Sequence, residues 1–183
     1  MTNRIGCAVM RIQPLHRGHT RIINQMIQDC ETAIVCLGST QKSRERHDPW
    51  TVEERMQMLR NVYADRIKIV PLTDLNAANP TQWAEYVFDK LKKLGMKEPT
   101  DYYTGSEQDS YWYRDHFNVN WQSGNIHDRR LHILNRENNP VPSATEIRGF
   151  LELRTDKWRE WVPAVNHELV QNTYPEEFKV PLT

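Results

Sequence analysis

The chain has little that would mark it for a membrane, a secretory route or a nucleic acid. Lysine plus arginine equals aspartate plus glutamate, at 24 each, so the formal net charge of the 183 residues is zero. This balance gives no support for nucleic acid or an anionic membrane as the partner. Apolar runs are all far shorter than the ~20 residues that span a bilayer, and the first residues lack a signal-peptide pattern. We therefore expect a cytoplasmic protein that binds neither nucleic acid nor a membrane.

Cysteine is also scarce, and two common nucleotide-binding motifs are missing. Cys7, Cys30 and Cys36 are odd in number and lack CxxC spacing, which favours reduced, mostly buried thiols over a disulfide or a metal site. The sequence contains neither G-x-G-x-x-G nor G-x-x-x-x-G-K-[ST], which disfavours hydride transfer on a dinucleotide and P-loop chemistry. Apolar residues make up 38% and charged residues 26%, a globular composition. The length suits a single domain over residues 1–183.

What is present is an alternation of short apolar runs with segments of helical periodicity. Expected strands lie at residues 5–12, 33–37, 66–72, 101–104 and 131–134, and expected helices at residues 18–30, 51–62, 80–94, 110–116 and 143–153. Two more helices, near 156–161 and 163–172, would form a C-terminal helical segment. This order predicts an α/β fold, a Rossmann-like doubly wound parallel sheet of about five strands with helices on both faces. Such a sheet binds its ligand at the carboxyl ends of its strands.

The sharpest motif follows the first expected strand, where residues 11–19 read RIQPLHRGH. His16 and His19 flank Gly18 at the start of a helix, where backbone N–H groups and the helix dipole attract anions. Gly18 allows the backbone to approach closely, and both imidazoles can donate hydrogen bonds to phosphate oxygens. Taken alone, the pair could equally be two partly exposed histidines near a helix cap. Their placement resembles the signature of the HIGH-motif nucleotidylyltransferase superfamily.

A second motif lies late in the chain, where residues 142–148 read PSATEIR. Ser143 and Thr145 supply donors at another helix start, and Arg148 lies one turn further with a planar fork that suits phosphate. Ser143 with Glu146 also fits a simple capping box, but that does not explain why it recurs in the right order after the first motif. The segment resembles the superfamily's [ST]-x-T-x-[IL]-R motif, which implies that it holds the β- and γ-phosphates of ATP.

Three further segments resemble the archaeal-type nicotinamide-nucleotide adenylyltransferases. They read GSTQ at residues 38–41, DPWTVEER at 48–55 and PLTDLN at 71–76, with Trp83 seven residues later. The resemblance covers residues 5–90 and 143–150 well. It departs at Met10, where the family usually has glycine, and in the aromatic stretch 107–125.

This resemblance implies an enzyme that transfers AMP from ATP to nicotinamide mononucleotide and releases pyrophosphate. It assigns catalytic roles to His16, His19, Arg11 and Arg148, and ATP binding to Arg11, Gln13, His16, Gly18, His19, Ser143, Thr145 and Arg148. It places the mononucleotide near Ser39, Arg46, Trp50, Asn76 and Trp83. An indole face can stack on the flat, cationic nicotinamide ring, an interaction worth ~1–2 kcal/mol when desolvated, and Asn76 could bind the carboxamide. By itself, Trp83 would more simply be a core aromatic on its helix.

The nucleophile, a 5′-phosphate oxygen, is already an anion, so positioning and charge stabilisation suffice without a covalent intermediate. Mg²⁺ is expected on the ATP oxygens and needs few protein ligands, so we assign no metal-binding side chains. The family resemblance also implies a homo-oligomer. Two alternatives stay open: the same chemistry on phosphopantetheine, FMN or an alcohol phosphate, and a non-catalytic nucleotide sensor on the same fold.

Overall fold

The computed structural model describes residues 4–75, 79–117, 125–126, 129–135 and 140–182. Its strands are β1 (Ile5–Met10), β2 (Thr32–Leu37), β3 (Lys68–Pro71), β4 (Asp101–Thr104), β5 (Asn125–Ile126) and β6 (Arg129–Ile133). Its α-helices are α1 (Arg17–Asp29), α2 (Val52–Tyr63), α3 (Pro80–Lys93), α4 (Tyr111–Phe117), α5 (Ala144–Glu152) and α6 (His167–Thr173). The five expected strands and the expected helices up to α5 are confirmed, with shifts of a few residues at their ends.

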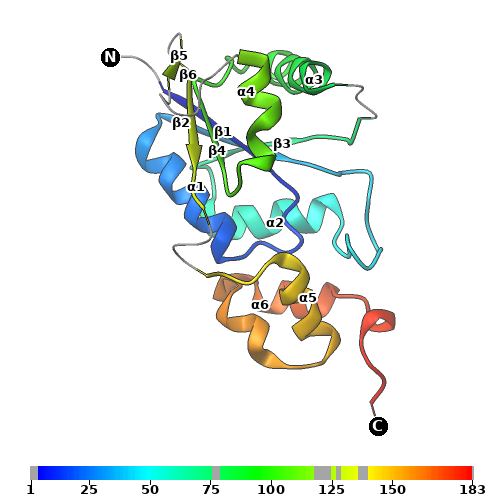
Figure 1. The fold of residues 1–183 in the computed structure, drawn as a ribbon. Helices are drawn as coiled ribbons and strands as arrows, with labels where there is room; N and C mark the ends of the chain where they lie inside the picture. Colours follow the sequence, from blue (N-terminus) through cyan, green and yellow to red (C-terminus); the bar gives the residue numbers. More distant parts are fainter. Residues whose placement is uncertain (1–3, 76–78, 118–124, 127–128, 136–139, 183) are drawn as a thin grey trace.

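The strands form one sheet in the order β3-β2-β1-β4-β6-β5 (Figure 1). Strands β3, β2, β1, β4 and β6 are parallel, as the sequence predicts. The two-residue strand β5 pairs antiparallel to β6 at the edge of the sheet, and the sequence did not predict it. The chain order reverses between the neighbouring strands β1 and β4, which makes this the topological switch point. Doubly wound sheets bind ligands there.

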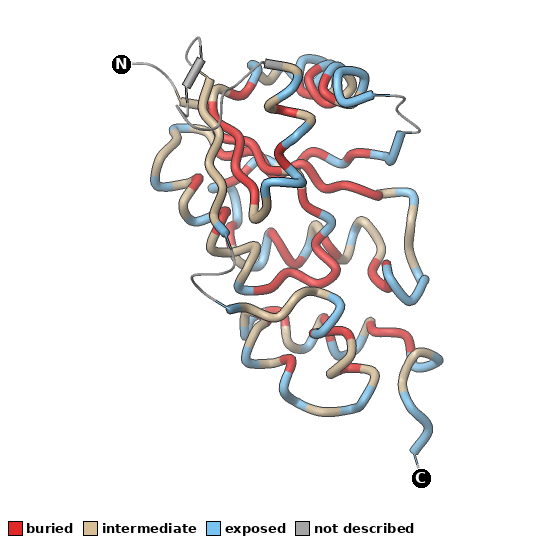
Figure 2. Tube along the Cα trace, in the orientation of Figure 1, coloured by how far each residue is buried: buried red, intermediate tan, exposed pale blue. Residues whose placement is uncertain are grey.

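Helices cover both faces of the sheet, and each face has its own hydrophobic core. On one face Ile23 of α1, Leu59 of α2 and Ile147 of α5 pack with Ala8 and Met10 of β1. On the other face α3 packs, with Tyr113 of α4, on Cys7 and Tyr102. Neighbouring strand residues such as Tyr102 and Tyr103 therefore enter opposite cores, as the two-residue period of a strand requires. Figure 2 shows the resulting concentration of buried positions in the central strands.

Helices α2 and α5 each begin with a capping box, and the one at Ser143 was predicted from the sequence. The Thr51 side chain accepts from the backbone N–H of Glu54, and the Glu54 carboxylate accepts from the N–H of Thr51, which completes a capping box. Ser143 and Glu146 form the same arrangement at α5. Helix α3 is followed by Gly95 at a φ of 72°, a left-handed conformation that glycine adopts without steric cost.

The C-terminal segment is helical, but its geometry differs from the expectation in part. Residues Asp156–Glu160 and Ala164–Asn166 form 3-10 helices, and only His167–Thr173 is α-helical. Trp158, Val162, Val170 and Tyr174 join the core that also contains α1 and α2. The segment is thus held against the body of the fold by shared apolar burial rather than by one long helix.

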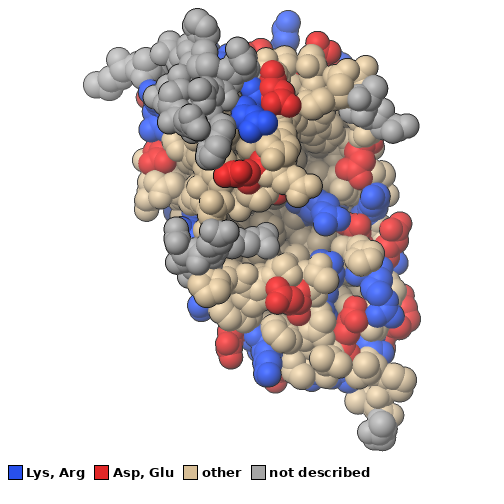
Figure 3. Space-filling model, in the orientation of Figure 1, with Lys and Arg blue, Asp and Glu red and all other residues tan. Residues whose placement is uncertain are grey.

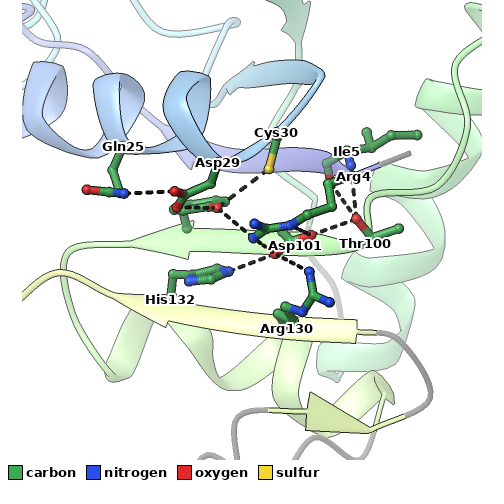
Figure 4. A network of polar contacts seen from close by, with 10 residues as sticks. Arg4, Ile5, Gln25, Asp29, Cys30, Thr100, Asp101, Arg130 and His132 are labelled. Atoms are coloured by element: carbon green, nitrogen blue, oxygen red, sulfur yellow. Dashed lines mark hydrogen bonds and ion pairs between the residues drawn. The ribbon is translucent and has the colours of Figure 1, made fainter. Parts of the chain in front are cut away.

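A polar network ties the amino end of β4 to its neighbours (Figure 4). The fully buried carboxylate of Asp101 accepts from Arg4 at 2.5 Å, from His132 at 2.8 Å and from Thr100 at 2.7 Å. Burial alone would raise the pKa of Asp101, but these three donors outweigh it and hold the pKa well below its ordinary value. The network lies at the end of β4 opposite to Thr104.

The three cysteines are free thiols. Cys7 and Cys36 are buried on neighbouring strands with their sulfur atoms 3.6 Å apart, and Cys30 is half-buried. The expectation of reduced, mostly buried cysteines is confirmed. In the described part of the chain, every helix is too short or too polar to cross a bilayer.

Candidate active site

A cavity of about 550 Å³ opens at the carboxyl ends of β1 and β4. Residues from the end of β1, the start of α1, the end of β4 and the start of α5 line it, together with one side chain each from α3 and α4. The space-filling view shows a hollow on this face, between the upper part with α3 and α4 and the lower part with α5 and α6 (Figure 3). Its volume lies in the ordinary range for small-molecule sites.

Two histidines build the N-terminus of α1. The Nδ1 atom of His16 accepts from the backbone N–H of Gly18 at 3.0 Å, and the Nδ1 atom of His19 accepts from the N–H of His16 at 3.4 Å. The two rings lie 3.9 Å apart. Because Nδ1 accepts in both, the neutral form of each imidazole carries its proton on Nε2. The start of α1 thus carries two imidazoles that line the cavity, and each can donate a hydrogen bond through its Nε2–H group.

Gly18 is required by this arrangement. A Cβ atom at position 18 would lie 2.8 Å from Cε1 and 3.0 Å from Nδ1 of His16. Both distances are shorter than normal van der Waals contact, so any side chain there would displace the His16 ring. The glycine therefore allows the imidazole to fold back over its own helix start.

The second helix start meets the first through Arg148, which is almost fully buried. Its guanidinium donates to the backbone carbonyl of Gln13 at 2.7 Å and to Oγ1 of Thr145 at 3.0 Å. Burial lowers the pKa of Arg148, since it penalises the charged form. A guanidinium nevertheless stays charged at neutral pH. Arg148, Thr145 and Ser143 line the same cavity as His16 and His19.

Arg11 supplies a more mobile positive charge. Its side chain is 60% exposed and lies 3.8 Å from the carboxylate of Asp48, which is buried. Oδ1 of Asp48 makes no hydrogen bond among the described residues. Its charge therefore attracts the Arg11 guanidinium, and Arg11 itself lines the cavity.

The ends of β1 and β2 depart from regular backbone geometry next to the cavity. Ile12 and Ser39 have positive φ values of 57° and 53°, a conformation that is costly for side chains other than glycine. Arg55 holds both turns, because its buried guanidinium donates to the carbonyls of Arg11 and Gly38 at 2.8 Å and of Ser39 at 3.1 Å. Burial lowers the pKa of Arg55. Arg55 therefore stabilises the turns that follow β1 and β2 by binding their carbonyls, rather than pairing with glutamates of its own helix.

All residues of the predicted ATP set line this one cavity: Arg11, Gln13, His16, Gly18, His19, Ser143, Thr145 and Arg148. The Gln13 side chain has partners within the protein. Its amide donates to the carbonyl of Trp50 and accepts from the N–H of Trp50, both at 3.1 Å. Gln13 therefore holds the loop in place, and its backbone carbonyl accepts from Arg148. A direct contact between Gln13 and ATP stays a prediction.

Of the residues predicted to bind the mononucleotide that the structure describes, only Trp83 lines the cavity. Trp83 lines the cavity and is half-buried, packed against Tyr86 with ring centres 5.6 Å apart. Ser39 lies outside the lining, where its hydroxyl donates to Asp74 at 2.8 Å. Asn76 lies outside the described residues.

Arg46 and Trp50 also lie outside the cavity lining, and their roles in binding the mononucleotide stay predictions. The Arg46 guanidinium donates to Glu152 at 3.0 Å and stacks over Phe178, away from the cavity lining. Trp50 is fully buried in the core, and its ring N–H donates to Thr173 at 2.8 Å. The sequence places an indole at this position for packing against the C-terminal segment, a role that a motif alone does not distinguish from ligand stacking.

Several lining residues were not predicted. Trp112 of α4 and Asp109 line the cavity from the aromatic stretch 107–125, for which no role was predicted, and Arg21 lines it from α1. Arg21 and Ile22 follow Gly18 by three and four residues, so helical spacing alone could have placed them on the cavity side of α1. Nothing in the local sequence indicates that α4 reaches the site, because the packing of α4 on α3 is a long-range contact.

Metal-binding side chains do not cluster in the described residues: no three His, Cys, Asp or Glu groups converge there. The donors at the two helix starts are N–H and hydroxyl groups, which suit phosphate oxygens rather than a cation. A divalent ion would fit here as part of a metal–nucleotide substrate, held by phosphates and water.

Known proteins share both the fold and the sequence pattern. The model of the cytidylyltransferase-like family matches residues 11–150, which span both helix starts. A nicotinamide-nucleotide adenylyltransferase of Methanospirillum hungatei is 41% identical over 69 residues, 36% of this chain and 40% of that protein. The enzyme of the same name from Thermococcus kodakarensis is 26% identical over 172 residues, 91% of this chain and 81% of that protein.

Among solved structures, a bifunctional NMN adenylyltransferase/ADP ribose pyrophosphatase from Francisella tularensis, complexed with AMP and a Mn ion, superposes with a TM-score of 0.68 at 18% identity. The match covers 97% of this chain and 51% of that one. The chain thus spans about half the length of this bifunctional relative. Since the family model covers most of the chain, including the helix starts at 16–19 and 143–148, the chain belongs to the cytidylyltransferase-like family.

Proposed function

We propose that the protein is a nicotinamide-nucleotide adenylyltransferase, which transfers AMP from MgATP to nicotinamide mononucleotide and forms NAD and pyrophosphate. The observation that carries the proposal is the convergence of two helix starts, 16–19 and 143–148, on one cavity that also contains the indole of Trp83. The names of the Methanospirillum and Thermococcus relatives support the choice of acceptor.

The reaction needs only positioning and charge stabilisation. A 5′-phosphate oxygen of the mononucleotide attacks the α-phosphorus of ATP, and the bond from that phosphorus to the oxygen bridging the α- and β-phosphates breaks. Pyrophosphate leaves with that oxygen and its electron pair, so no proton has to be transferred. His16 and His19 donate through Nε2 to the charge that develops on the transferred phosphate.

Arg148 and Arg11 have different parts in this scheme. Arg148 is locked to the Gln13 carbonyl and provides a fixed positive charge for the β- and γ-phosphates. Arg11 has an exposed side chain and can follow the triphosphate as it binds. Mg²⁺ arrives with ATP and neutralises phosphate charge. Assembly of several copies into a homo-oligomer is part of the same proposal and rests on the family resemblance alone.

The direct test is to incubate the protein with ATP, Mg²⁺ and a panel of phosphorylated acceptors, and to follow pyrophosphate. The panel contains nicotinamide mononucleotide, phosphopantetheine, FMN and an alcohol phosphate, and mass spectrometry identifies the adenylylated product. We expect the highest kcat/KM with the nicotinamide nucleotide. Higher activity with another acceptor would reject nicotinamide mononucleotide as the substrate. If no acceptor leads to release of pyrophosphate, the nucleotide-sensor alternative remains.

A further inference from the structure

The side of the cavity formed by α3 and α4 differs chemically from the side formed by the two helix starts. Trp83 from α3, Trp112 from α4 and Asp109 from the turn before α4 line it. Helices α3 and α4 lie together over the same face of the sheet (Figure 1). The cationic and imidazole groups of the described lining come instead from β1, α1 and α5: Arg11, His16, His19, Arg21 and Arg148.

Trp112 and Asp109 are held by one phenol. The ring N–H of Trp112 donates to the hydroxyl of Tyr102 at 3.3 Å, and this hydroxyl donates to the backbone carbonyl of Asp109 at 3.4 Å. Tyr102 is almost completely buried in β4, next to the switch point. The indole also packs edge-on against the Tyr102 ring, with ring centres 4.9 Å apart. Strand β4 therefore positions both groups relative to the cavity.

The Asp109 carboxylate is itself oriented. Its Oδ2 accepts from the hydroxyl of Ser106 at 2.8 Å, and the backbone N–H of Asp109 donates back to that hydroxyl at 3.2 Å. Ser106 is in turn linked to Thr104 at the end of β4. This chain of bonds orients a negative charge at the cavity that Trp83 and Trp112 also line. The Ser106 hydroxyl donates to one of the two carboxylate oxygens.

A flat cation suits this surrounding. Indole faces attract a positive ring, and a nearby carboxylate adds to that attraction. A ring that carries a carboxylate of its own brings a like charge toward Asp109, whereas a carboxamide is neutral and can donate through its NH₂ group.

We infer that Asp109, which lines the cavity together with Trp83 and Trp112, selects pyridine mononucleotides with an uncharged carboxamide over those with a carboxylate. The inference rests on the proposed function and names a specificity-determining residue for it. Asp109 acts on the substituent of the acceptor ring and leaves the ATP side of the cavity unaffected.

The test compares nicotinamide and nicotinate mononucleotides as acceptors for the wild type and for Asp109→Asn. The asparagine keeps an oxygen for the Ser106 hydroxyl and removes the charge. We expect the wild type to prefer the amide, and the ratio of the two kcat/KM values to fall about tenfold in the variant, mainly through a gain on the acid. The KM for ATP stays unchanged. Asp109→Glu, which restores the charge, keeps a preference for the amide.

Glu107→Gln is the matched control. It makes the same change of charge two residues earlier in the same turn, at an exposed side chain outside the cavity lining. We expect its amide-to-acid ratio to remain within about twofold of the wild type. An unchanged ratio in Asp109→Asn, with NAD still formed, overturns the inference and leaves the proposed function intact. If the wild type adenylylates neither nucleotide, the proposed function fails and the inference fails with it.

Discussion

Replacing Gly18 by alanine should separate catalysis from stability at the first helix start. The added Cβ would lie 2.8 Å from Cε1 of His16, whereas ordinary contact begins at 3.4 Å, so the ring must move by about 0.6 Å or more. This motion breaks the 3.0 Å bond from the Gly18 N–H to Nδ1 of His16. Losing a cap costs about 1 kcal/mol, but alanine in a helix regains about the same amount relative to glycine.

The expected result is therefore a near-normal Tm with a large loss of activity. A displacement of this size at a phosphate-binding group should lower kcat by about 10–100-fold. Steady-state kinetics of pyrophosphate release and thermal unfolding followed by circular dichroism measure the two effects.

Gly149→Ala provides the control, because a Cβ there meets nothing within 4 Å and the position lies in the α5 helix. It should keep kcat and raise stability by about 0.4–1 kcal/mol. Wild-type kcat in Gly18→Ala would show that the His16 ring has no part in the reaction, and a large drop in Tm would show that the glycine serves the fold instead.

Three further results are expected. His19→Ala should lower kcat by about 10²–10³-fold at nearly unchanged stability, and full activity of the purified variant would contradict the assignment. Trp83→Ala should raise the KM for the mononucleotide much more than the KM for ATP, and equal effects on both would indicate a core indole. Asp101→Asn should lower the free energy of unfolding by about 3 kcal/mol at pH 7. The folded pKa of Asp101 is depressed, so its carboxylate stabilises the fold at neutral pH, begins to lose this effect as the pH falls below about 4, and loses the rest only as the pH approaches the much lower folded pKa. Urea unfolding at steps from pH 7 down to about pH 2 should therefore show the difference in stability between variant and wild type narrowing progressively in acid. A constant difference over this range would exclude the charge as its cause.

The site gains its order from contacts between turns that are distant in the sequence. Arg55 binds the carbonyls at the ends of β1 and β2, Arg148 binds the carbonyl of Gln13, and the Gln13 side chain binds the backbone of Trp50. Buried guanidinium and amide groups of this kind stabilise only when each donor finds an acceptor. The turns beside the cavity are therefore held by side chains from other parts of the chain, and of these three Arg55 lies outside the cavity lining.

Local chemistry determined much of this protein. The capping boxes at Thr51 and Ser143 depend on residues three positions apart, and the strand and helix periods depend on neighbours along the chain, so both can be seen in the sequence. The two phosphate motifs are similarly local, because each consists of one helix start and the side chains that follow it. Their convergence on one cavity follows from the parallel sheet that those periods predict.

Tertiary structure decided which aromatic side chains line the cavity. Trp50 and Trp83 both stand in segments that resemble substrate motifs, yet Trp50 packs in the core and Trp83 lines the cavity. Trp112 and Asp109 join Trp83 only because α4 packs on α3 and Tyr102 binds the turn before α4. An indole can pack in a core or line a cavity, and the surfaces that decide between the two come from residues far away in the chain.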